Sequence, residues 1–530
     1  MNRSVRTLRM GIAALGVILV AGACGSSSDD AAGGGDRSNS TLTIATSGIR
    51  SMDPARQYDQ PALWVNGLAL EGLIKLDSDG KVQPALATKV DTPDPLTYVY
   101  TLREGVKFWN GAEVTPDDVV YSLTRYQDET AQTASKYASV DTIEATGPME
   151  VTVTLKQPDS SWQYTPAYAG QIVEKKFAEE HDKDLGGPGV LTMGTGPWQP
   201  KDFNSSAGMT FAKNEAWWGA AEAGDDFEES WKTVKLVFAA AVPGAAAVRA
   251  GDVDGVVGGD GTAFSSGSSV ELTKAPTETL GYITLLTDKG PLADVHVRRA
   301  LAHLVDREAI IKSALKGFGD PATQMVSERV WTDLPEDQVS AAYDQIETLD
   351  YDVDAAKAEL DQSAYAPGDK IVAEVISTYP SFVRATEILK EEAAKIGLEI
   401  EIKGLPGAEW LTNSSNHTTE MTVSTYSSLS PDPNFYPNTL MRADGIPVGG
   451  SNYANLDVPG LDDAVRTAST VPAQSAEQLD AVVGALKANA SEAAYIPIYT
   501  QQAVFAHDPK LSFDGFSQYA MGSPYPLYVK

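Results

Sequence analysis

The segment Thr425 to Tyr436, TYSSLSPDPNFY, carries an unusual set of side chains for binding chemistry. It has two prolines and four hydroxyl residues besides its aromatics, and it shows no strand or helix periodicity. This pattern predicts a loop, and loops on a rigid scaffold often carry binding residues. Its hydroxyls and rings suit hydroxyl-rich or amide ligands, because neutral hydrogen bonds and stacking dominate such pockets. The hydroxyls could equally satisfy the loop's own backbone.

The residue types used in catalysis are present, but not in catalytic arrangements. The sequence has no HExxH, GxSxG or GxxxxGK[ST] motif, and its one cysteine is Cys24. The five histidines are scattered along the chain: His181, His296, His303, His417 and His507. These patterns favour a binding protein over a hydrolase or oxidoreductase, and they predict no catalytic residue, no cofactor and no metal site.

The formal charge of −31 limits the classes of partner that we expect the protein to bind. Such an acidic surface repels phosphate backbones, so nucleic acid is not expected as a partner. The charge could attract a cationic ligand, but solubility outside the cell explains it more simply. The length of 530 residues indicates several structural units.

The N-terminus has the pattern of an export signal. Three arginines precede a short apolar run that ends in Val20-Ala21-Gly22-Ala23-Cys24. Small residues before a lone cysteine resemble a bacterial lipobox, which predicts a signal peptide over residues 1–23 and lipidation of Cys24. An ordinary signal peptide with an incidental cysteine is the alternative. Residues 24–40, rich in Gly, Ser and Asp, are expected to form a flexible tether.

Ordered elements follow the tether. The stretch Pro84 to Arg125 predicts a strand over Leu96 to Arg103 and then a helix capped by Thr115. A strand–helix–strand unit over residues 371–402 predicts parallel pairing and hence an α/β lobe. Trp64, Leu68 and Leu73 are expected on one helical face, and the DSDG sequence at Asp77 on a hairpin turn rather than a calcium loop.

Six segments in order resemble one family. The stretch TYVYTLREGVKFWNGAEVTPDDVVYSLTR resembles the signature of the extracytoplasmic solute-binding proteins of ABC importers, family 5, the class of oligopeptide, dipeptide and nickel binders. The other five are GTGPWQPKDF from Gly194, NEAWW from Asn214, VRAGDVDGV from Val248, DVHVRRALAHLVDREAII from Asp294 and YDVDAAKAEL from Tyr351. Together they span nearly the whole chain after the tether.

This resemblance implies an α/β, two-lobed periplasmic-binding-protein-like fold (type II, cluster C) with an extra subdomain. The division it implies is 41–76, 193–284 and 499–530 for the first lobe, 77–192 for the accessory subdomain, and 285–498 for the second lobe. It also implies a monomeric receptor, held at the outer face of the cytoplasmic membrane by its lipid. Such a receptor delivers a small solute, with a peptide as the first expectation, to an ABC permease.

The resemblance also implies ligand contacts on both sides of an interlobe cleft. In the first lobe the expected contacts are Tyr58 and Trp64, although Trp64 could equally be a core residue. In the second lobe the expected contacts are Tyr379, Trp410, Tyr426, Ser427, Ser428 and Asp432. Asp432 could instead hold a turn.

One position departs from the peptide binders of the family. Those proteins place an aspartate for the peptide's α-amino group three residues before the DP pair, where this chain has Leu429. A buried ammonium without a carboxylate costs several kcal/mol, so a free peptide N-terminus would need another partner. A saccharide, a metal chelate or another polar solute therefore remains an alternative cargo, and an extracellular enzyme or signalling receptor an alternative class.

Overall fold

The computed structural model describes residues 41–239, 241–258, 261–264, 269–519, 522 and 524–530. The predicted signal peptide, Cys24 and the tether lie outside the described residues. Within the described ranges, no helix is long and apolar enough to cross a membrane.

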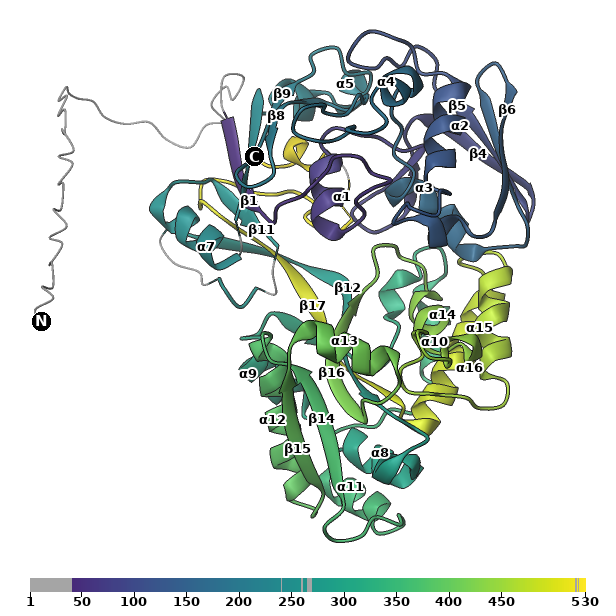
Figure 1. Ribbon diagram of the computed structural model, residues 1–530, viewed down its shortest axis with the longest axis vertical. Coiled ribbons are helices and arrows are strands. Elements are labelled where there is room, and N and C mark those ends of the chain that lie inside the picture. The colour runs from purple at the N-terminus through teal and green to yellow at the C-terminus, as the bar shows by residue number, and fades with distance from the viewer. Residues whose placement is uncertain (1–40, 240, 259–260, 265–268, 520–521, 523) are drawn as a thin grey trace, which may run out of the picture. The chain divides into compact units, whose positions relative to one another are not determined.

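An eleven-stranded mixed sheet runs through both lobes of an α/β fold, as predicted (Figure 1). Its order is β15-β14-β16-β12-β17-β11-β1-β10-β9-β8, and β13 pairs with β17. The first-lobe strands are β1 (Thr41–Thr46), β8 (Trp198–Asn204), β9 (Gly208–Lys213), β10 (Thr233–Phe238) and β11 (Gly255–Val257). The second-lobe strands are β13 (Gly319–Pro321), β14 (Lys370–Ile376), β15 (Glu399–Leu405) and β16 (Met421–Ser427).

Two long strands join the lobes. β12 (Glu271–Leu285) and β17 (Tyr495–His507) are antiparallel to each other along most of their length. Their register shifts between Pro276 and Leu280, where the pair passes from one lobe to the other. The irregular pairing interrupts the ladder at this point, which makes it the natural place for a bend.

The predicted strand–helix–strand unit is confirmed in the second lobe. β14 and β15 are parallel and joined by α12 (Pro380–Ala394), whose apolar face packs into the lobe core. The remaining second-lobe helices are α8 (Val295–Ala302), α9 (Arg307–Ala314), α10 (Glu336–Tyr343), α11 (Val353–Leu360), α13 (Gly407–Ser415), α14 (Phe435–Leu440), α15 (Leu461–Thr470) and α16 (Ala476–Glu492).

A four-stranded antiparallel sheet, β4-β5-β7-β6, lies beside the first lobe (Figure 1). Its strands are β4 (Ala87–Asp94), β5 (Thr97–Leu102), β6 (Val140–Gly147) and β7 (Glu150–Leu155). The predicted helix is confirmed as α2 (Pro116–Arg125), with Thr115 and Asp118 forming a reciprocal capping box. Val119 and Leu123 of α2 are fully buried against this sheet, so the helix is held by its apolar face.

The first lobe and the four-stranded sheet carry shorter elements. They are α1 (Gln60–Asn66), α3 (Thr165–Tyr168), α4 (Lys175–Glu180), α5 (Ala220–Ala223), α6 (Asp225–Glu228) and α7 (Ala241–Ala250). β2 (Ile74–Leu76) and β3 (Val82–Pro84) form a hairpin, as the DSDG sequence predicted, with Gly80 at φ 86° in its turn.

The prediction of one helix through Trp64, Leu68 and Leu73 is wrong. α1 ends at Asn66, and the following residues form tight turns rather than a helix. Gly72 explains part of this path, because a Cβ there would lie 2.4 Å from the carbonyl oxygen of Pro166. Leu68 and Leu73 are nevertheless fully buried. The apolar pattern therefore indicated which residues are buried, but not the type of structure they form.

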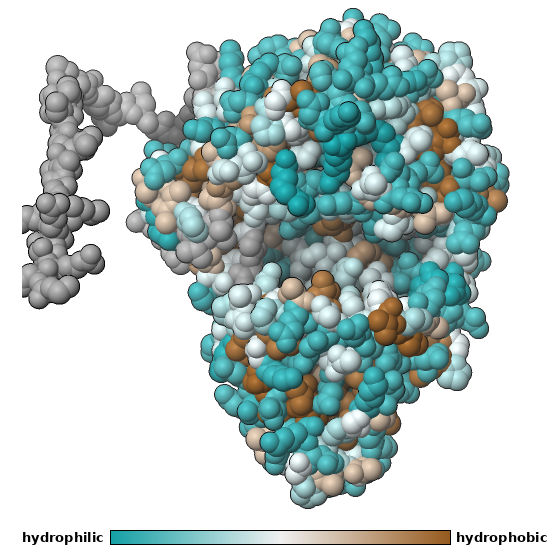
Figure 2. Space-filling model, in the orientation of Figure 1, coloured by the Kyte–Doolittle hydropathy of each residue, from teal (hydrophilic) through white to brown (hydrophobic). Residues whose placement is uncertain are grey.

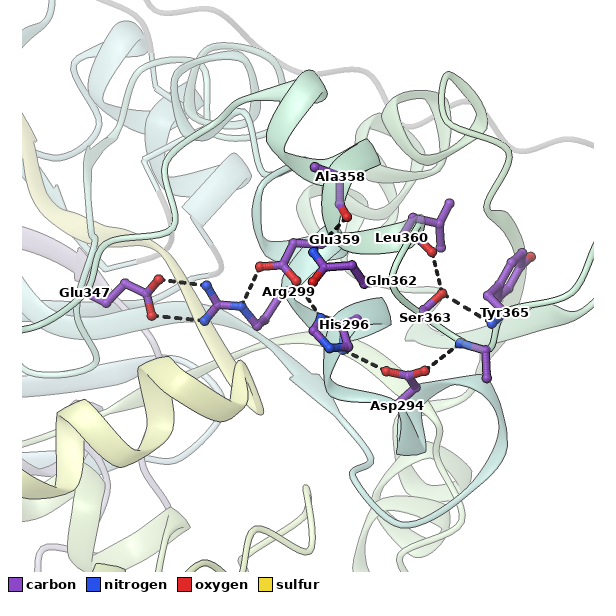
Figure 3. A network of polar contacts seen from close by, with 11 residues as sticks. Asp294, His296, Arg299, Glu347, Ala358, Glu359, Leu360, Gln362, Ser363 and Tyr365 are labelled. Atoms are coloured by element: carbon purple, nitrogen blue, oxygen red, sulfur yellow. Dashed lines mark hydrogen bonds and ion pairs between the residues drawn. The ribbon is translucent and has the colours of Figure 1, made fainter.

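A polar network fixes the outer part of the second lobe (Figure 3). Arg299 of α8 binds Glu347 through two bonds and Glu359 of α11 through Nε at 2.8 Å. The ring of His296 contacts the other oxygen of Glu359 at 2.7 Å, while Asp294 caps α8 and accepts the N–H of Ala364. Each charged group in the network is paired, which is typical of a structural contact rather than a catalytic one.

Candidate functional site

The carboxyl ends of the parallel strands in the two lobes face each other. β17 runs from the second lobe into the first, where it pairs with β11. β11 is antiparallel to β17, so β11 runs back toward the second lobe. β1 is parallel to both β11 and β10, so these two strands run in the same direction as β1. β16 is antiparallel to β12 and runs toward the first lobe, as do β14 and β15. Ligands of open α/β sheets bind outside the carboxyl ends of the strands. Figure 2 shows a hollow between the two lobes, and this interlobe cleft is the candidate site.

The first-lobe side of the cleft begins with the segment after β1. A buried ion pair fixes this segment, since Asp53 is fully buried and binds both terminal nitrogens of Arg125 on α2, at 3.0 and 2.6 Å. Asp59 then caps α1 by accepting the N–H of Ala62 at 2.9 Å. The segment that carries the predicted residue Tyr58 is therefore held at both ends.

Tyr58 and Trp64 lie on this side. The ring of Tyr58 is partly buried, with its centroid 6.2 Å from that of Tyr168, and burial raises the pKa of its hydroxyl well above the usual value. Trp64 is 7% exposed, and its indole lies 3.1 Å from the position that a Cβ on Gly258 would take, just past the end of β11. Trp64 is thus largely a core residue that borders the cleft.

On the second-lobe side, the predicted loop over residues 425–436 is shorter than expected. β16 continues to Ser427, because its backbone pairs with β12 as far as Thr279, and α14 begins at Phe435. Tyr426 therefore lies on a strand, where its ring packs 5.7 Å from that of Phe435. Ser427 is exposed, and its hydroxyl lies 2.8 Å from that of Thr279.

Ser428 and Asp432 shape the remaining loop. Ser428 is buried, and its hydroxyl donates to the carbonyl oxygen of Ser430 at 2.5 Å. Asp432 accepts the N–H of Asn434 at 3.0 Å, which is a turn contact. Burial raises the pKa of Asp432 to about 6, with a smaller rise from Asp159, while the Asn434 hydrogen bond and Lys136 act in the opposite direction.

Trp410 and Tyr379 follow the carboxyl ends of β15 and β14. Trp410, on α13, donates its indole N–H to the hydroxyl of Thr422 at 2.9 Å, so this donor is already used. Tyr379 is 52% exposed at the start of α12, and its ring stacks on Phe382 at 5.0 Å. The structure thus places both at the second-lobe edge of the cleft, where Tyr379 has the more accessible ring.

A small cavity lies where the two sides of the cleft meet, and we call it the apolar recess. It has a volume of about 40 Å³ and is open to solvent on one side. Its lining comes from α1, β2, α3, the β16–α14 loop and the C-terminal segment. The lining residues are Gln60, Leu63, Trp64, Leu76, Ala167, Tyr168, Leu429, Gln518, Tyr519 and Gly522, and none of them is charged.

A second cavity of about 510 Å³ shares Tyr519 with the first, and we call it the polar recess. It lies beside the point where β12 crosses between the lobes. Its lining includes four charged residues, Asp79, Lys81, Glu278 and Arg329, together with Ser78, Ala275, Pro276, Thr332, Gly515, Phe516, Ser517 and Tyr519.

One ion pair dominates the polar recess. The side chain of Glu278 is 6% exposed and binds Nε of Arg329 at 2.8 Å, while Nη2 of Arg329 donates to the carbonyl oxygen of Thr277. Burial raises the pKa of Glu278, and the charge and hydrogen bonds of Arg329 lower it. The N–H of Glu278 donates to Oε1 of Gln518 at 2.8 Å, which links the crossing part of β12 to the C-terminal segment.

Several residues of the two recesses were missed by the sequence reasoning. Tyr168, Gln518, Tyr519, Glu278 and Arg329 occur in segments without a binding motif, and they meet only through the fold. Leu63 is one residue from the predicted Trp64, and Leu429 was noted only as a departure from the family pattern. The aromatic residues near the C-terminus were a usable signal for Tyr519.

The described residues hold no group of three or more His, Cys, Asp and Glu side chains that could bind a metal ion. The histidine and carboxylates in Figure 3 belong to the second-lobe network and are paired with each other and with Arg299. The cleft offers aromatic surface, amides and hydroxyls, which are groups that line solute-binding sites.

A family model described as "Bacterial extracellular solute-binding proteins, family 5 Middle" matches residues 81–447. Protein XP55 of Streptomyces lividans is 28% identical over 486 residues, which cover 88% of this chain and 84% of that protein. The glutathione-binding protein GsiB of Salmonella paratyphi A is 25% identical over 371 residues, 68% of this chain and 69% of that protein.

Solved structures show the same fold. The ABC transporter substrate-binding protein CtaP of Listeria monocytogenes superposes with a TM-score of 0.77 at 18% identity. The match covers 93% of this chain and 99% of CtaP. The predicted two-lobed fold is confirmed by this likeness together with the sheet topology described above.

Proposed function

The chain belongs to the bacterial extracellular solute-binding proteins of family 5, the solute receptors of ABC importers, and on this premise we propose that it captures a peptide or peptide-like molecule. The observation that supports this proposal is the interlobe cleft, where the carboxyl edges of two parallel sheets face each other across aromatic and amide side chains. Closure of the lobes on the solute would create the form that a permease recognises.

The proposed contacts are the eight residues inferred from the sequence. Tyr58 and Trp64 act from the first lobe, with Trp64 serving mainly as an apolar wall. From the second lobe, Tyr379, Trp410, Tyr426 and Ser427 present rings and a hydroxyl at the carboxyl edge. Ser428 and Asp432 act indirectly, because their side-chain contacts fix the loop that carries Leu429.

A non-peptide solute is the second candidate, and a specific observation favours it. The apolar recess has no charged residue in its lining, so it offers no direct partner for a peptide ammonium. An uncharged saccharide or another polar solute would meet no such cost. Both candidates are receptors, and a ligand screen separates them.

The screen measures thermal stability of the soluble protein lacking residues 1–24 against peptides, saccharides and metal chelates. A bound solute at about 100 times its Kd should raise stability by about 2.7 kcal/mol. Tyr426→Phe should reduce the shift given by a hit, while Tyr351→Phe, on the exposed surface of the second lobe, should leave it unchanged. Turnover of the hit, rather than its reversible binding, would contradict a transport receptor.

The division of the chain into residues 41–76, 77–192, 193–284, 285–498 and 499–530 remains our proposal. The boundaries at 284/285 and 498/499 fall within β12 and β17, the two strands that cross between the lobes. We also propose that the protein acts as a monomer and that the lipid on Cys24 anchors it to the outer face of the cytoplasmic membrane. Cys24→Ser protein found firmly in the membrane fraction would contradict the anchor.

A further inference from the structure

A polar contact joins the second lobe to the region of the four-stranded sheet, apart from the crossing strands β12 and β17. The turn Ser160–Gln163 follows β7 and packs against α15, which lies to one side of β17 (Figure 1). The hydroxyl of Ser160 donates to the carbonyl oxygen of Ala468, in the last turn of α15, at 3.0 Å. Nε2 of Gln474, just past α15, donates to the hydroxyl of Tyr164 at 2.9 Å. We call these four residues the lobe contact.

The lobe contact is shielded from water, and its polar groups are paired. Each of its four residues is at most 5% exposed. Gln474 uses its whole side-chain amide, because Nε2 also donates to the carbonyl oxygen of Val330 at 2.9 Å and Oε1 accepts the N–H of Thr332 at 3.0 Å. Loss of one partner would leave a buried group unpaired for as long as the lobes stay together.

The backbone of Gln474 is held in an unusual conformation. Its φ of 59° lies in the left-handed region, which residues other than glycine rarely adopt. Its N–H donates to Oε1 of Gln478 at 2.8 Å, and Nε2 of Gln478 donates to the carbonyl oxygen of Ala468 at 3.0 Å. Such a conformation persists where surrounding contacts impose it. The second lobe therefore presents the Gln474 amide to Tyr164 in a fixed position.

The two sides of the lobe contact belong to different apolar cores. Trp162 and Tyr164 pack in the core that the four-stranded sheet shares with α2, whereas Val465 and Ala468 pack in the core around α15 and α16. The two sides can therefore separate without taking either core apart. Water would then satisfy the freed hydroxyl, amide and carbonyl groups.

We propose that the lobe contact is a latch that stabilises the closed arrangement of the lobes before any solute binds. It forms when the lobes approach and breaks when they part, while β12 and β17 keep the lobes joined. The latch also reaches the crossing point, because Gln474 binds both neighbours of residue 331 and Arg329 beside them binds Glu278 of β12. This inference goes beyond the proposed receptor function, since it concerns the conformations of the chain without solute.

Single-molecule fluorescence energy transfer tests the latch on the detergent-solubilised full chain without solute. Cys24→Ser removes the one native cysteine, and Val90→Cys and Val448→Cys add a dye site to each side, at positions 36% and 73% exposed. Two states of different transfer efficiency should be present. Ser160→Ala and Tyr164→Phe should each raise the open-to-closed ratio roughly twofold to tenfold, and the double variant should raise it further.

Two control variants remove hydroxyls whose bonds stay on one side of the cleft. Ser161→Ala removes a hydroxyl that donates to Oδ1 of Asp159 at 2.7 Å, and Tyr126→Phe removes a buried hydroxyl that donates to the carbonyl oxygen of Gln171 at 2.8 Å. Both should leave the open-to-closed ratio unchanged. Thermal melting shows whether each variant folds, and Ser160→Ala alone decides the test if Tyr164→Phe does not.

The outcomes are independent of the cargo, because no solute is present. A higher open-to-closed ratio in the latch variants alone supports the latch, even where the solute screen finds no peptide. A single state in every protein, or an equal rise in the latch and control variants, would show that the lobe contact is a fixed seam and would overturn the proposal.

Discussion

The two recesses share Tyr519 but differ in chemistry. The apolar recess has about 40 Å³ and no charged lining residue, whereas the polar recess has about 510 Å³ and four. The first is lined mainly by apolar and aromatic side chains, whereas the buried pair of Glu278 and Arg329 dominates the second. The difference shows that neighbouring parts of one cleft can present very different chemistry to a solute.

Breaking the ion pair of the polar recess should have the largest effect on stability. Arg329→Met leaves Glu278, whose side chain is 6% exposed, without its cation and should lower the free energy of unfolding by about 2 to 3 kcal/mol. This value is below that for a fully buried pair because the side chain of Arg329 is 35% exposed. Urea denaturation at neutral pH measures it.

The double variant Glu278→Gln with Arg329→Met is the matched control. It removes both charges, so much of the lost stability should return. A loss below about 1 kcal/mol in the single variant would show that water, rather than Arg329, compensates Glu278, and that the two recesses differ less than their linings indicate.

Truncating a wall of the apolar recess should have a smaller effect. Leu63→Ala removes a side chain that is 9% exposed and should cost about 2 kcal/mol, near the low end for leucine because it already borders a cavity. Val448→Ala, at a site 73% exposed, should stay within about 0.5 kcal/mol. Equal losses in both variants, measured by the same urea series, would show that the recess wall is not packed.

These contrasts also show what the sequence could predict. α2 and the β14–α12–β15 unit were predicted because their signals are local: Thr115 and Asp118 form a cap within one turn, and the apolar periods match each element. The recesses depend on tertiary contacts, since Leu63, Tyr168, Leu429 and Gln518 come from four distant segments. No local pattern brings such residues together.

The errors have the same cause. The loop prediction over residues 425–436 relied on an absence of periodicity, but pairing with β12 makes Tyr426 and Ser427 part of a strand. Conversely, the helix expected to reach Leu73 ends at Asn66, and the close approach of Gly72 to Pro166 accounts for part of the path that follows. The family resemblance named two segments, after β1 and at the end of β16, as sides of the cleft, and the contacts that they would make remain predictions.

The charge at Asp432 offers a pH-dependent test of how dry the surroundings of the apolar recess are. Burial raises the pKa of Asp432 from 3.8 to about 6, so the folded state holds this proton more tightly than the unfolded state. The contribution of Asp432 to the free energy of unfolding is fully present below pH 4 and is lost as the pH rises through 6. The loss should reach about 1.5 kcal/mol, less than the full shift implies because the carboxyl is partly exposed.

Asp432→Asn isolates this effect from the other acids. The stability difference between Asp432→Asn and wild type should grow between pH 4 and pH 7, in favour of the variant, as urea denaturation at several pH values would show. A difference that stays constant over this range would mean that Lys136 and solvent fully compensate the charge.

The smallest expected effects concern the loop that brings Leu429 to the apolar recess. Ser428 is buried and donates to the carbonyl oxygen of Ser430, so Ser428→Ala should cost about 1 kcal/mol and loosen the position of Leu429 between them. Ser427→Ala removes an exposed hydroxyl and should cost less than about 0.5 kcal/mol. If Ser428→Ala also weakens binding of a solute found in the screen while its stability loss stays small, the loop geometry, and not only the apolar character of Leu429, contributes to binding. If Ser427→Ala is the more harmful of the two for stability, the bond between Ser428 and Ser430 does not hold the loop.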